Sequence, residues 1–310
     1  MSADLQNPIF NDENKAREAL EATIWPNGRV CPHCGNFDQE KIAKAQGKAA
    51  RPGLYYCAAC NGQFTATVGT VFERSKIPLS KWWLAMHLLG TSKNGMSAHQ
   101  LHRSLGVTYK TAWFMAHRIR EAMTDRNPPE PLGGKGKTVE VDETYIGRLE
   151  GVPKPRGGSS HKNVVLTLVE RGGSARSFHI DSVSVADMKP IIDANIARET
   201  AMMTDQAASY PEILAGYASH ETVNHAREEY VRGHVHTNTV EGYYSVFKRG
   251  MKGVYQHCAE KHLHRYLSEF DFRYSNRSAL GIEDRERVSK VATGIIGKRL
   301  TYRRTNEAGF

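Results

Sequence analysis

Three acidic residues, far apart in the sequence, occupy positions from which their carboxylates could reach one site. Asp142 lies near the end of a strand-like alternating segment, Asp205 ends a short apolar segment, and Glu241 lies in a segment of helical periodicity. Carboxylate oxygens are ligands that Mg²⁺ and Mn²⁺ prefer. Two such ions can hold the attacking and leaving oxygens while a phosphodiester is cut. The three acids therefore indicate metal-dependent chemistry at phosphorus.

Each acid also has an ordinary structural alternative. Glu143 is as acidic as its neighbour Asp142. We favour Asp142 because it shares a strand face with Glu140, which leaves two valines to pack together on the other face. Asp205 precedes a Ser-Tyr-Pro segment, so its alternative role is to cap the next helix. Because the three acids occur together in this strand order, a shared site is favoured over three separate roles.

Glu241 belongs to a segment, His236–Lys252, that is expected to be helical. Thr237 and Thr239 are residues of the N-cap type, and the positions behind them separate into two faces at about 100° per residue. The apolar face contains Val240, Tyr243, Tyr244, Phe247 and Met251. The polar stripe contains Asn238, Glu241, Ser245, Lys248 and Lys252. This pattern suits a helix at the rim of a phosphate-handling site, and an ordinary amphipathic helix is the alternative.

Four of the five cysteines form two Cys-x2-Cys pairs, namely Cys31, Cys34, Cys57 and Cys60. Each pair makes a tight turn that points two thiolates at one place, and two pairs complete the tetrahedral site of a structural zinc ion. The 22 residues between the pairs suit a ribbon hairpin. His33 lies inside a knuckle and is interpreted as a bystander, and Cys258 has no partner motif, so it is expected to be a plain thiol.

From Pro78 the pattern becomes helical, and two helices joined by a turn at Gly106 are expected. Ser97 and Gln100 form a capping box at the start of the first helix, and the second helix is basic. This arrangement is typical of a helix-turn-helix, in which the start of the second helix reads base edges. A helical hairpin for packing or dimerisation is the alternative. The candidate DNA-binding residues of the second helix are Tyr109, Lys110, Thr111 and Arg118.

A Pro- and Gly-rich segment separates this part from a second region of strands and helices. In that region three strands come first, and then helix, strand, helix, strand and helix follow in turn. Because no helix separates the first three strands, a mixed sheet is expected rather than a doubly wound one. The expected parts are an N-terminal helix (1–27), a zinc ribbon (28–76) with an alternating strand over 63–74, a helix-turn-helix (77–127), a linker (128–137), an α/β domain (138–280) and a basic tail (281–310).

The composition limits the classes of function. The chain has 310 residues, 40% of them hydrophobic, so it can bury more than one core, and its net charge of +9 favours nucleic acid as a partner. No apolar run approaches the length of a membrane span, and the polar N-terminus has no signal sequence. We therefore expect a cytoplasmic, nucleoid-associated protein whose cysteines are reduced or bind metal.

Several motifs together resemble the bacterial insertion-sequence transposases of the ISXO-like group. They are VDETYIG, the Thr-Asp pair at 204–205, and HTNTVEGYYSVFKRG followed by GVYQHCAEKHLHRYLSEFDFRYSNR. The resemblance covers residues 28–277 and is most specific over 139–147 and 236–277. It implies a multidomain α/β protein with an N-terminal zinc ribbon, a helix-turn-helix and a DDE catalytic domain, whose RNase H-like fold is a mixed β-sheet flanked by helices.

The resemblance also implies roles for individual residues. Asp142 and Asp205 would be the first two metal ligands. In DDE transposases a basic residue follows the glutamate by seven positions, and Lys248 stands seven positions after Glu241. Parts of the group have asparagine at the third position, which would be Asn238 here. We favour Glu241 because a third negative charge binds two cations better than a neutral amide, and Asn238 stays an open alternative.

The implied activity is DNA transposition. Water activated between two Mg²⁺ ions would cut a phosphodiester at the element end, and the resulting 3′-OH would attack target DNA. Lys162, in a basic loop, would contact phosphates together with Lys248, Arg249 and Lys252. Because two terminal inverted repeats must be paired, a homodimer or larger assembly is expected. The alternatives are an RNase H-like nuclease or resolvase that does not join ends, and a DNA-binding regulator without catalysis.

Overall fold

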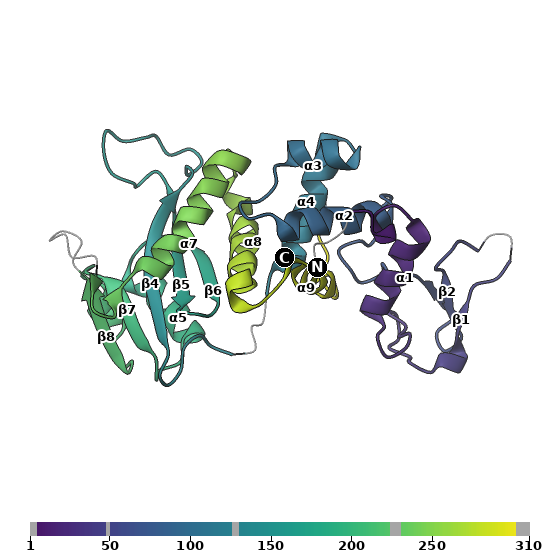
Figure 1. Cartoon of the computed structure of the whole chain (residues 1–310), viewed down its shortest axis with the longest axis horizontal. Coiled ribbons are helices and arrows are strands. Elements are labelled where there is room, and N and C mark those ends of the chain that lie inside the picture. Colours follow the sequence, from purple (N-terminus) through teal and green to yellow (C-terminus); the bar gives the residue numbers. More distant parts are fainter. Residues whose placement is uncertain (1–4, 48–49, 126–129, 224–230, 302–310) are drawn as a thin grey trace, which may run out of the picture. The chain divides into compact units, whose positions relative to one another are not determined.

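The computed structural model describes residues 5–47, 50–125, 130–223 and 231–301. The chain divides into two compact units (Figure 1). The first unit combines the segment up to Ser92, residues 96–123 and the segment from Glu283 onward, and the second contains residues 93–95 and 124–282. Among the described residues, no helix is both long enough and apolar enough to span a membrane.

The first unit begins with helix α1 (Glu13–Ile24) and the ribbon. The ribbon is a three-stranded antiparallel sheet in the order β1 (Ile42–Lys44), β2 (Tyr55–Cys57) and β3 (Gly62–Phe64). The predicted strand over residues 63–74 is wrong beyond Phe64, where the chain makes successive turns. The apolar residues of those turns, Val71 and Phe72, are buried, so their spacing reflects packing from turns rather than a strand.

Further helices complete the first unit, namely α2 (Leu79–Thr91), α3 (Ala98–Leu105), α4 (Tyr109–Met123) and α9 (Asp284–Thr293). Helices α3 and α4 are joined as predicted. The Ser97 hydroxyl accepts a hydrogen bond from the amide of Gln100 at 3.1 Å, which starts α3. The helix ends at Gly106, whose φ of +60° lies in the left-handed region that favours glycine. The two helices and glycine turn expected of a helix-turn-helix are therefore present.

The predicted basic tail from residue 281 is wrong over its described part. Helix α9 packs against α2 and α4 of the first unit and buries Val291 and Ala292. After the helix, the carbonyl of the buried Ile295 accepts a hydrogen bond from the amide of Val71 at 3.3 Å. The sequence is weakly patterned because few apolar side chains fix this helix. Residues 302–310 of the predicted tail lie outside the described residues.

The second unit is built on a five-stranded mixed sheet in the order β6-β5-β4-β7-β8. Its strands are β4 (Thr138–Ile146), β5 (Asn163–Glu170), β6 (Ala175–Ile180), β7 (Ala201–Asp205) and β8 (Ser219–Val223). β5 pairs antiparallel with β4 and β6, whereas β7 lies parallel to both β4 and β8. The predicted RNase H-like mixed sheet is thus confirmed. A short hairpin of β9 (Val231–Arg232) and β10 (Val235–His236) was not predicted.

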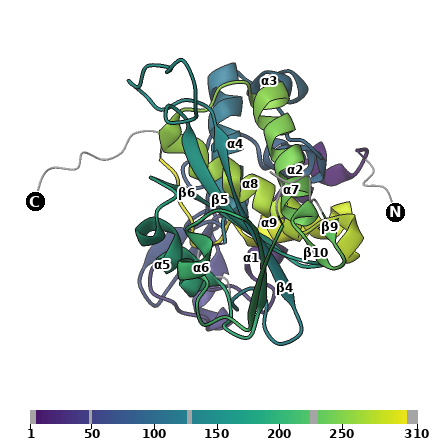
Figure 2. The ribbon, with the colours of Figure 1, turned by 90° about the vertical axis from the view of Figure 1, so that its left-hand side faces the viewer.

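Helices lie on both sides of this sheet, as Figure 2 shows. They are α5 (Val185–Asn195), α6 (Tyr210–Ile213), α7 (Asn238–Arg249) and α8 (Leu263–Ser275). Helices α5 and α6 share a core with one face, and α7 and α8 share a core with the other. Shorter helical segments are Pro8–Phe10, Gln39–Lys41, Glu260–His262, Ser278–Leu280 and a wider turn that continues α7, Gly250–Tyr255.

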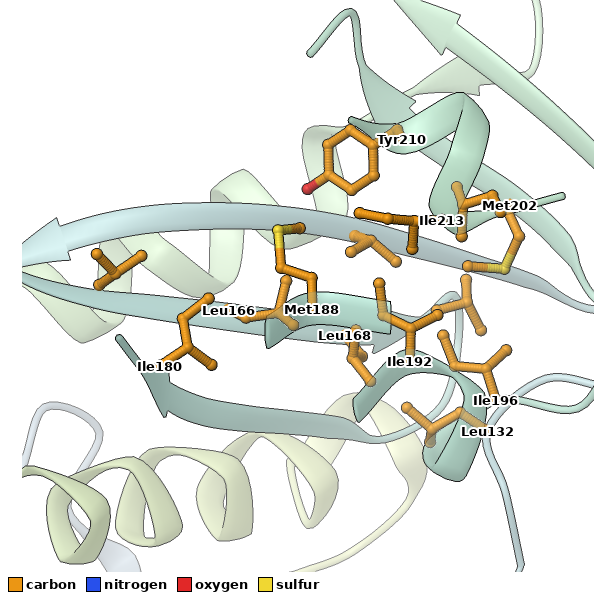
Figure 3. Packing of buried hydrophobic residues seen from close by; sticks show 14 residues of the cluster. Leu132, Leu166, Leu168, Ile180, Met188, Ile192, Ile196, Met202, Tyr210 and Ile213 are labelled. Carbon is orange, nitrogen blue, oxygen red and sulfur yellow. The ribbon is translucent and has the colours of Figure 1, made fainter. Parts of the chain in front are cut away.

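Strand β5 supplies side chains to both cores by alternation. Leu166 and Leu168 pack with Met188 and its neighbours on the α5 side (Figure 3). Val165 and Val169 pack with α7 and α8 on the other side. Because both faces of the sheet are covered, this strand reads as a nearly continuous apolar run.

The described part of the predicted linker, residues 128–137, packs onto the second unit instead. Leu132 is buried in the core on the α5 side. The amide of Gly133 donates to Glu170 Oε2 at 2.8 Å, and a Cβ at this glycine would lie 2.1 Å from Thr200 Oγ1. This close approach requires glycine at position 133, so this glycine reflects packing rather than a free linker. Residues 128 and 129 lie outside the described residues.

Candidate active site and zinc centre

Asp142 and Asp205 lie on neighbouring parallel strands at the same level. The pairing of β4 with β7 sets Glu140 opposite Met203, and the same register continued by two residues sets Asp142 opposite Asp205. Residues paired in this way point to the same face of a sheet, so both carboxylates share the face of Glu140. The strand continues to Ile146, so Asp142 lies in its middle and not near its end, where it was predicted.

Helix α7 presents Glu241 from its first turn. All five predicted apolar residues of the helix are buried, namely Val240, Tyr243, Tyr244, Phe247 and Met251. Asn238 and Glu241 are exposed, so the predicted division into an apolar face and a polar stripe is confirmed. Thr237 is the N-cap residue, but its hydroxyl donates to Glu241 Oε1 at 3.1 Å and makes no hydrogen bond to a helix amide.

A buried carboxylate from β4 caps α7 instead. Glu140, which is 0% exposed, accepts hydrogen bonds at Oε2 from the amides of Thr239 and Val240, at 2.7 and 2.9 Å. Its Oε1 accepts from the Thr239 hydroxyl at 2.7 Å and from Arg171 Nε at 2.6 Å. A carboxylate at a helix N-terminus accepts hydrogen bonds from the free amides there, and its negative charge interacts favourably with the positive end of the helix dipole. This contact joins the helix of Glu241 to the strand of Asp142.

A tyrosine one turn further along makes a second attachment. The hydroxyl of Tyr244 donates to the backbone carbonyl of Asp142 at 2.6 Å and lies 3.2 Å from that of Val165. The ammonium of Lys248 lies 5.5 Å from the centre of the Tyr244 ring, within the range of a cation–π contact. The lysine is therefore held beside the strand that carries Asp142.

The acids around Asp142 disfavour its ionisation. Burial, followed by the negative charges of Glu143, Asp205 and Glu241, raises the pKa of Asp142 to about 7. Burial also raises the pKa of Glu143, whose carboxylate accepts a hydrogen bond from the Tyr210 hydroxyl at 2.6 Å on the α6 side. A divalent cation among these carboxylates would relieve the repulsion, so the donor set fits Mg²⁺ or Mn²⁺.

The four predicted cysteine ligands meet at one point of the ribbon, where their Sγ atoms all lie within 4.8 Å of one another. Cys31 Sγ lies 3.7 Å from Cys60 Sγ, and the other two sulfurs lie 3.8 Å apart. Thiolates about 2.3 Å from a tetrahedral zinc ion are separated by roughly 3.8 Å, so these distances fit zinc. His33 Nε2 lies 3.1 Å from the carbonyl of Gln63. In the described part of the chain, no other three His, Cys, Asp or Glu side chains approach this closely.

Most of the predicted DNA-contacting residues are accessible. Tyr109 is 45% exposed and Lys110 is exposed at the start of α4, beside the half-buried Thr111. In the second unit Arg249 and Lys252 are exposed, and Lys162 is half-buried.

Arg118 is an exception and requires a correction. Only 8% of it is exposed, because this part of α4 packs into the first unit. Its Nε donates to the carbonyl of Leu300 at 3.1 Å, and another guanidinium nitrogen donates to the carbonyl of Glu73 at 3.2 Å. The guanidinium therefore serves internal packing, and we remove Arg118 from the predicted DNA-binding set.

Sequence reasoning missed three residues that organise the site. Glu140 was noted only for its strand face and Tyr244 only as an apolar residue of the predicted helix, while Arg171 was not among the predicted site residues. A charged residue within a strand that is otherwise buried was the available signal for Glu140, since such a charge requires partners. The partners themselves come from segments distant in the sequence.

The mixed sheet with its paired acids beneath a capped helix, together with the cysteine-rich ribbon, is the arrangement expected of a zinc-ribbon transposase of the DDE type. Comparison with known families agrees. Residues 131–275 match the ISXO2-like transposase domain, and residues 11–63 match the transposase zinc-ribbon domain. The chain therefore carries an ISXO2-like transposase domain behind a transposase zinc ribbon.

Individual proteins also resemble this chain. An uncharacterized protein in transposable element ISH50 of Halobacterium salinarum is 29% identical over 281 residues, which cover 85% of this chain and 91% of that protein. The crystal structure of a pre-cleavage Mos1 transpososome aligns over 68% of this chain and 78% of that one, with 11% identity and a TM-score of 0.27. This score is too low to define a common fold.

Proposed function

We propose that this chain is a DNA transposase that binds the terminal inverted repeats of its insertion sequence, cuts DNA at the element ends and joins them to target DNA. The observation that carries the proposal is the register of β4 and β7, which sets Asp142 opposite Asp205 on the sheet face that also receives α7. The match of this unit to the ISXO2-like transposase domain supports the same activity.

In this proposal Asp142, Asp205 and Glu241 hold two Mg²⁺ or Mn²⁺ ions. Such ions, when bound, supply the positive charge that activates an attacking oxygen and stabilises a leaving one. The contribution of the chain is to present the carboxylates at fixed positions. β4 and β7 fix the two aspartates, and the Thr237 hydroxyl orients Glu241. Lys248 holds a non-bridging phosphate oxygen as a point charge.

The first unit supplies binding to the element ends. The zinc ribbon and the start of α4, with Tyr109, Lys110 and Thr111, contact double-stranded DNA, while Lys162, Arg249 and Lys252 contact its phosphates. The net charge of +9 suits this partner. Because two ends are paired before joining, the active form is a homodimer or a larger assembly.

A strand-transfer assay tests the proposal. The protein is incubated with Mg²⁺, supercoiled target DNA and short duplexes that carry a pre-cleaved element end. We expect joined products with the wild type and none with Asp142→Ala, while both proteins bind the duplex equally. Hydrolysis without joined products would favour the nuclease alternative. If Asp142→Ala retained every activity of the wild type, the non-catalytic regulator would be favoured.

A further inference from the structure

Glu140 is a buried acid that binds the first turn of α7, His236 and Arg171. It is fully buried on β4, two residues before Asp142 and on the same strand face. Its carboxylate accepts hydrogen bonds from the amides of Thr239 and Val240 and from the hydroxyl of Thr239, all at 2.9 Å or less. A buried charge is tolerated only when it is paired and hydrogen-bonded, and Glu140 meets both conditions.

The arrangement divides two tasks between two residues. In most helices the N-cap side chain accepts the second or third helix amide. Here Glu140 accepts both of these amides, and the N-cap residue Thr237 donates its hydroxyl to Glu241 instead. The capping group and the group that orients the proposed metal ligand are therefore different residues, and the capping group lies on the strand of Asp142.

Arg171 fixes the chain that leads into α7. Its Nε pairs with Glu140 Oε1 at 2.6 Å, and its terminal nitrogens donate to the carbonyls of His234 and His236 at 2.7 and 2.8 Å. Its own amide donates to the carbonyl of Thr138 on β4 at 3.0 Å. The guanidinium thus neutralises the buried carboxylate and joins the β9–β10 hairpin to the central strand.

We propose that Glu140 is a positioning residue that sets the distance and direction of Glu241 and Asn238 from Asp142 and Asp205, and that metal affinity depends on it. The proposal rests on the proposed function, because it concerns the same carboxylates. Around Glu140, strand β4 pairs with β5 on one side and with β7 on the other. Because these pairings hold the strand in place, the attachment at Glu140 fixes the position of α7. Loss of the cap frees the first turn of α7, which carries the third ligand.

The alternative is that Glu140 contributes stability alone. Two measurements that do not depend on DNA cleavage distinguish the roles. Calorimetric titration with Ca²⁺ gives the affinity of the carboxylate site, and hydrogen exchange gives the protection of the amides of Thr239 and Val240. Glu140→Gln keeps the size of the side chain and removes its charge. Glu170→Gln is the matched control, because Glu170 lies on the adjacent strand and also accepts a backbone amide, that of Gly133.

For Glu140→Gln we expect faster exchange at both amides and a Ca²⁺ affinity lowered by about tenfold or more, the size typical of residues that orient metal ligands. Glu170→Gln should leave both values at those of the wild type. The proposal is overturned if Glu140→Gln binds Ca²⁺ as the wild type does. It is also overturned if both variants lose thermal stability and Ca²⁺ affinity equally, since the role is then structural.

A second variant separates this inference from the proposed function. Asp142→Asn should lose strand transfer and Ca²⁺ affinity, while the amides of Thr239 and Val240 keep their protection. If Asp142→Asn transferred strands normally, the proposed function itself would fail. If Asp142→Asn were inactive and Glu140→Gln were unchanged in Ca²⁺ affinity, only the positioning role would fail.

Discussion

The cysteine centre of the ribbon and the carboxylate site of the sheet are assembled in opposite ways. The four cysteines come from two tight turns of the ribbon, one before β1 and one between β2 and β3, and their sulfurs lie within 4.8 Å of one another. The proposed carboxylate ligands come from β4, β7 and α7, which lie far apart in the sequence. The first centre is local and closed, whereas the second depends on the tertiary fold.

The electrostatic state of the acids sharpens this contrast. Burial and three neighbouring acids raise the pKa of Asp142 to about 7. Without a bound cation, the ionised carboxylates therefore repel one another. A closed zinc site contributes to folding outright, whereas a catalytic site has to leave positions for the reacting groups. We therefore expect zinc to hold the ribbon together, and we propose that a divalent cation at the carboxylates would relieve their repulsion without being needed for the fold.

The largest expected effect is that of zinc removal. A strong chelator should unfold the ribbon, because zinc binding to such sites contributes on the order of 10 kcal/mol to folding. Removal of Mg²⁺ should leave the folded structure of the second unit unchanged. Zinc content and the dispersion of NMR signals from the ribbon are the measurements. A ribbon that stays folded without zinc would remove the distinction between the two centres.

The next effect concerns the third carboxylate. Glu241→Gln should reduce Mg²⁺-dependent cleavage by at least about a hundredfold, the scale for loss of one electrostatic group from an active site. Asn238→Ala should only weaken it, because a neutral amide contributes less to binding a cation pair. Both proteins are compared in one cleavage assay with equal DNA occupancy. The reverse ranking would make Asn238 the third ligand.

Asp142→Asn should stabilise the metal-free protein in a pH-dependent manner. Because the folded-state pKa of Asp142 is raised from 3.8 to about 7, the folded state holds more protons than the unfolded state between these values, and its stability falls as the pH rises. At pH 8 the variant should therefore be more stable by a few kcal/mol, about 4 at most. The difference should vanish below pH 4.

The measurement is denaturant unfolding of both proteins from pH 4 to 8, with and without Mg²⁺. Asp271, whose pKa burial raises to about 6, titrates in both proteins, so its effect cancels in the difference. Saturating Mg²⁺ should narrow the gap at pH 8, since it stabilises only the ionised site. A variant that is less stable than the wild type at pH 8 would contradict the stored repulsion.

The smallest effect belongs to Thr237. Thr237→Val keeps the shape of the side chain and removes the hydroxyl that donates to Glu241. Loss of one hydrogen bond to a charged group costs about 1.5–3 kcal/mol when it is fully formed, and less here because Glu241 is exposed. We expect a severalfold rise in the Mg²⁺ concentration needed for half-maximal cleavage, with thermal stability nearly unchanged. Thr237→Ser should restore the wild-type value, and failure to do so would exclude the hydroxyl as the cause.

The sequence predicted those features that depend on local pattern. The two Cys-x2-Cys turns, the apolar face of α7 and the order of strands follow from spacing and alternation alone. The C-terminal helix α9 was missed because its few apolar residues, such as Val291, pack on helices far away in the sequence. The linker was misassigned because the glycine that signals flexibility also permits close packing, as at Gly133.

The candidate metal ligands could be predicted from the sequence, but the residues that hold them in position could not. Asp142, Asp205 and Glu241 could be selected by residue type and position. The cap on α7 pairs residues about 100 positions apart, Glu140 with Val240, and only the tertiary fold brings them together. Burial of Arg118 was equally invisible, because a basic residue on a helix reads as exposed until its neighbours are known.

One measurement tests the central claim most directly, which is that Asp142, Asp205 and Glu241 form one metal site. Mg²⁺ is replaced by Fe²⁺ in the whole chain, and hydrogen peroxide and ascorbate are added. The bound Fe²⁺ reduces the peroxide to hydroxide and a hydroxyl radical, which cuts the backbone beside the iron. We predict cuts near all three residues, suppressed by excess Mg²⁺ and absent in Asp142→Asn. Cuts confined to one of the three segments, or cuts that persist in Asp142→Asn, would contradict the shared site.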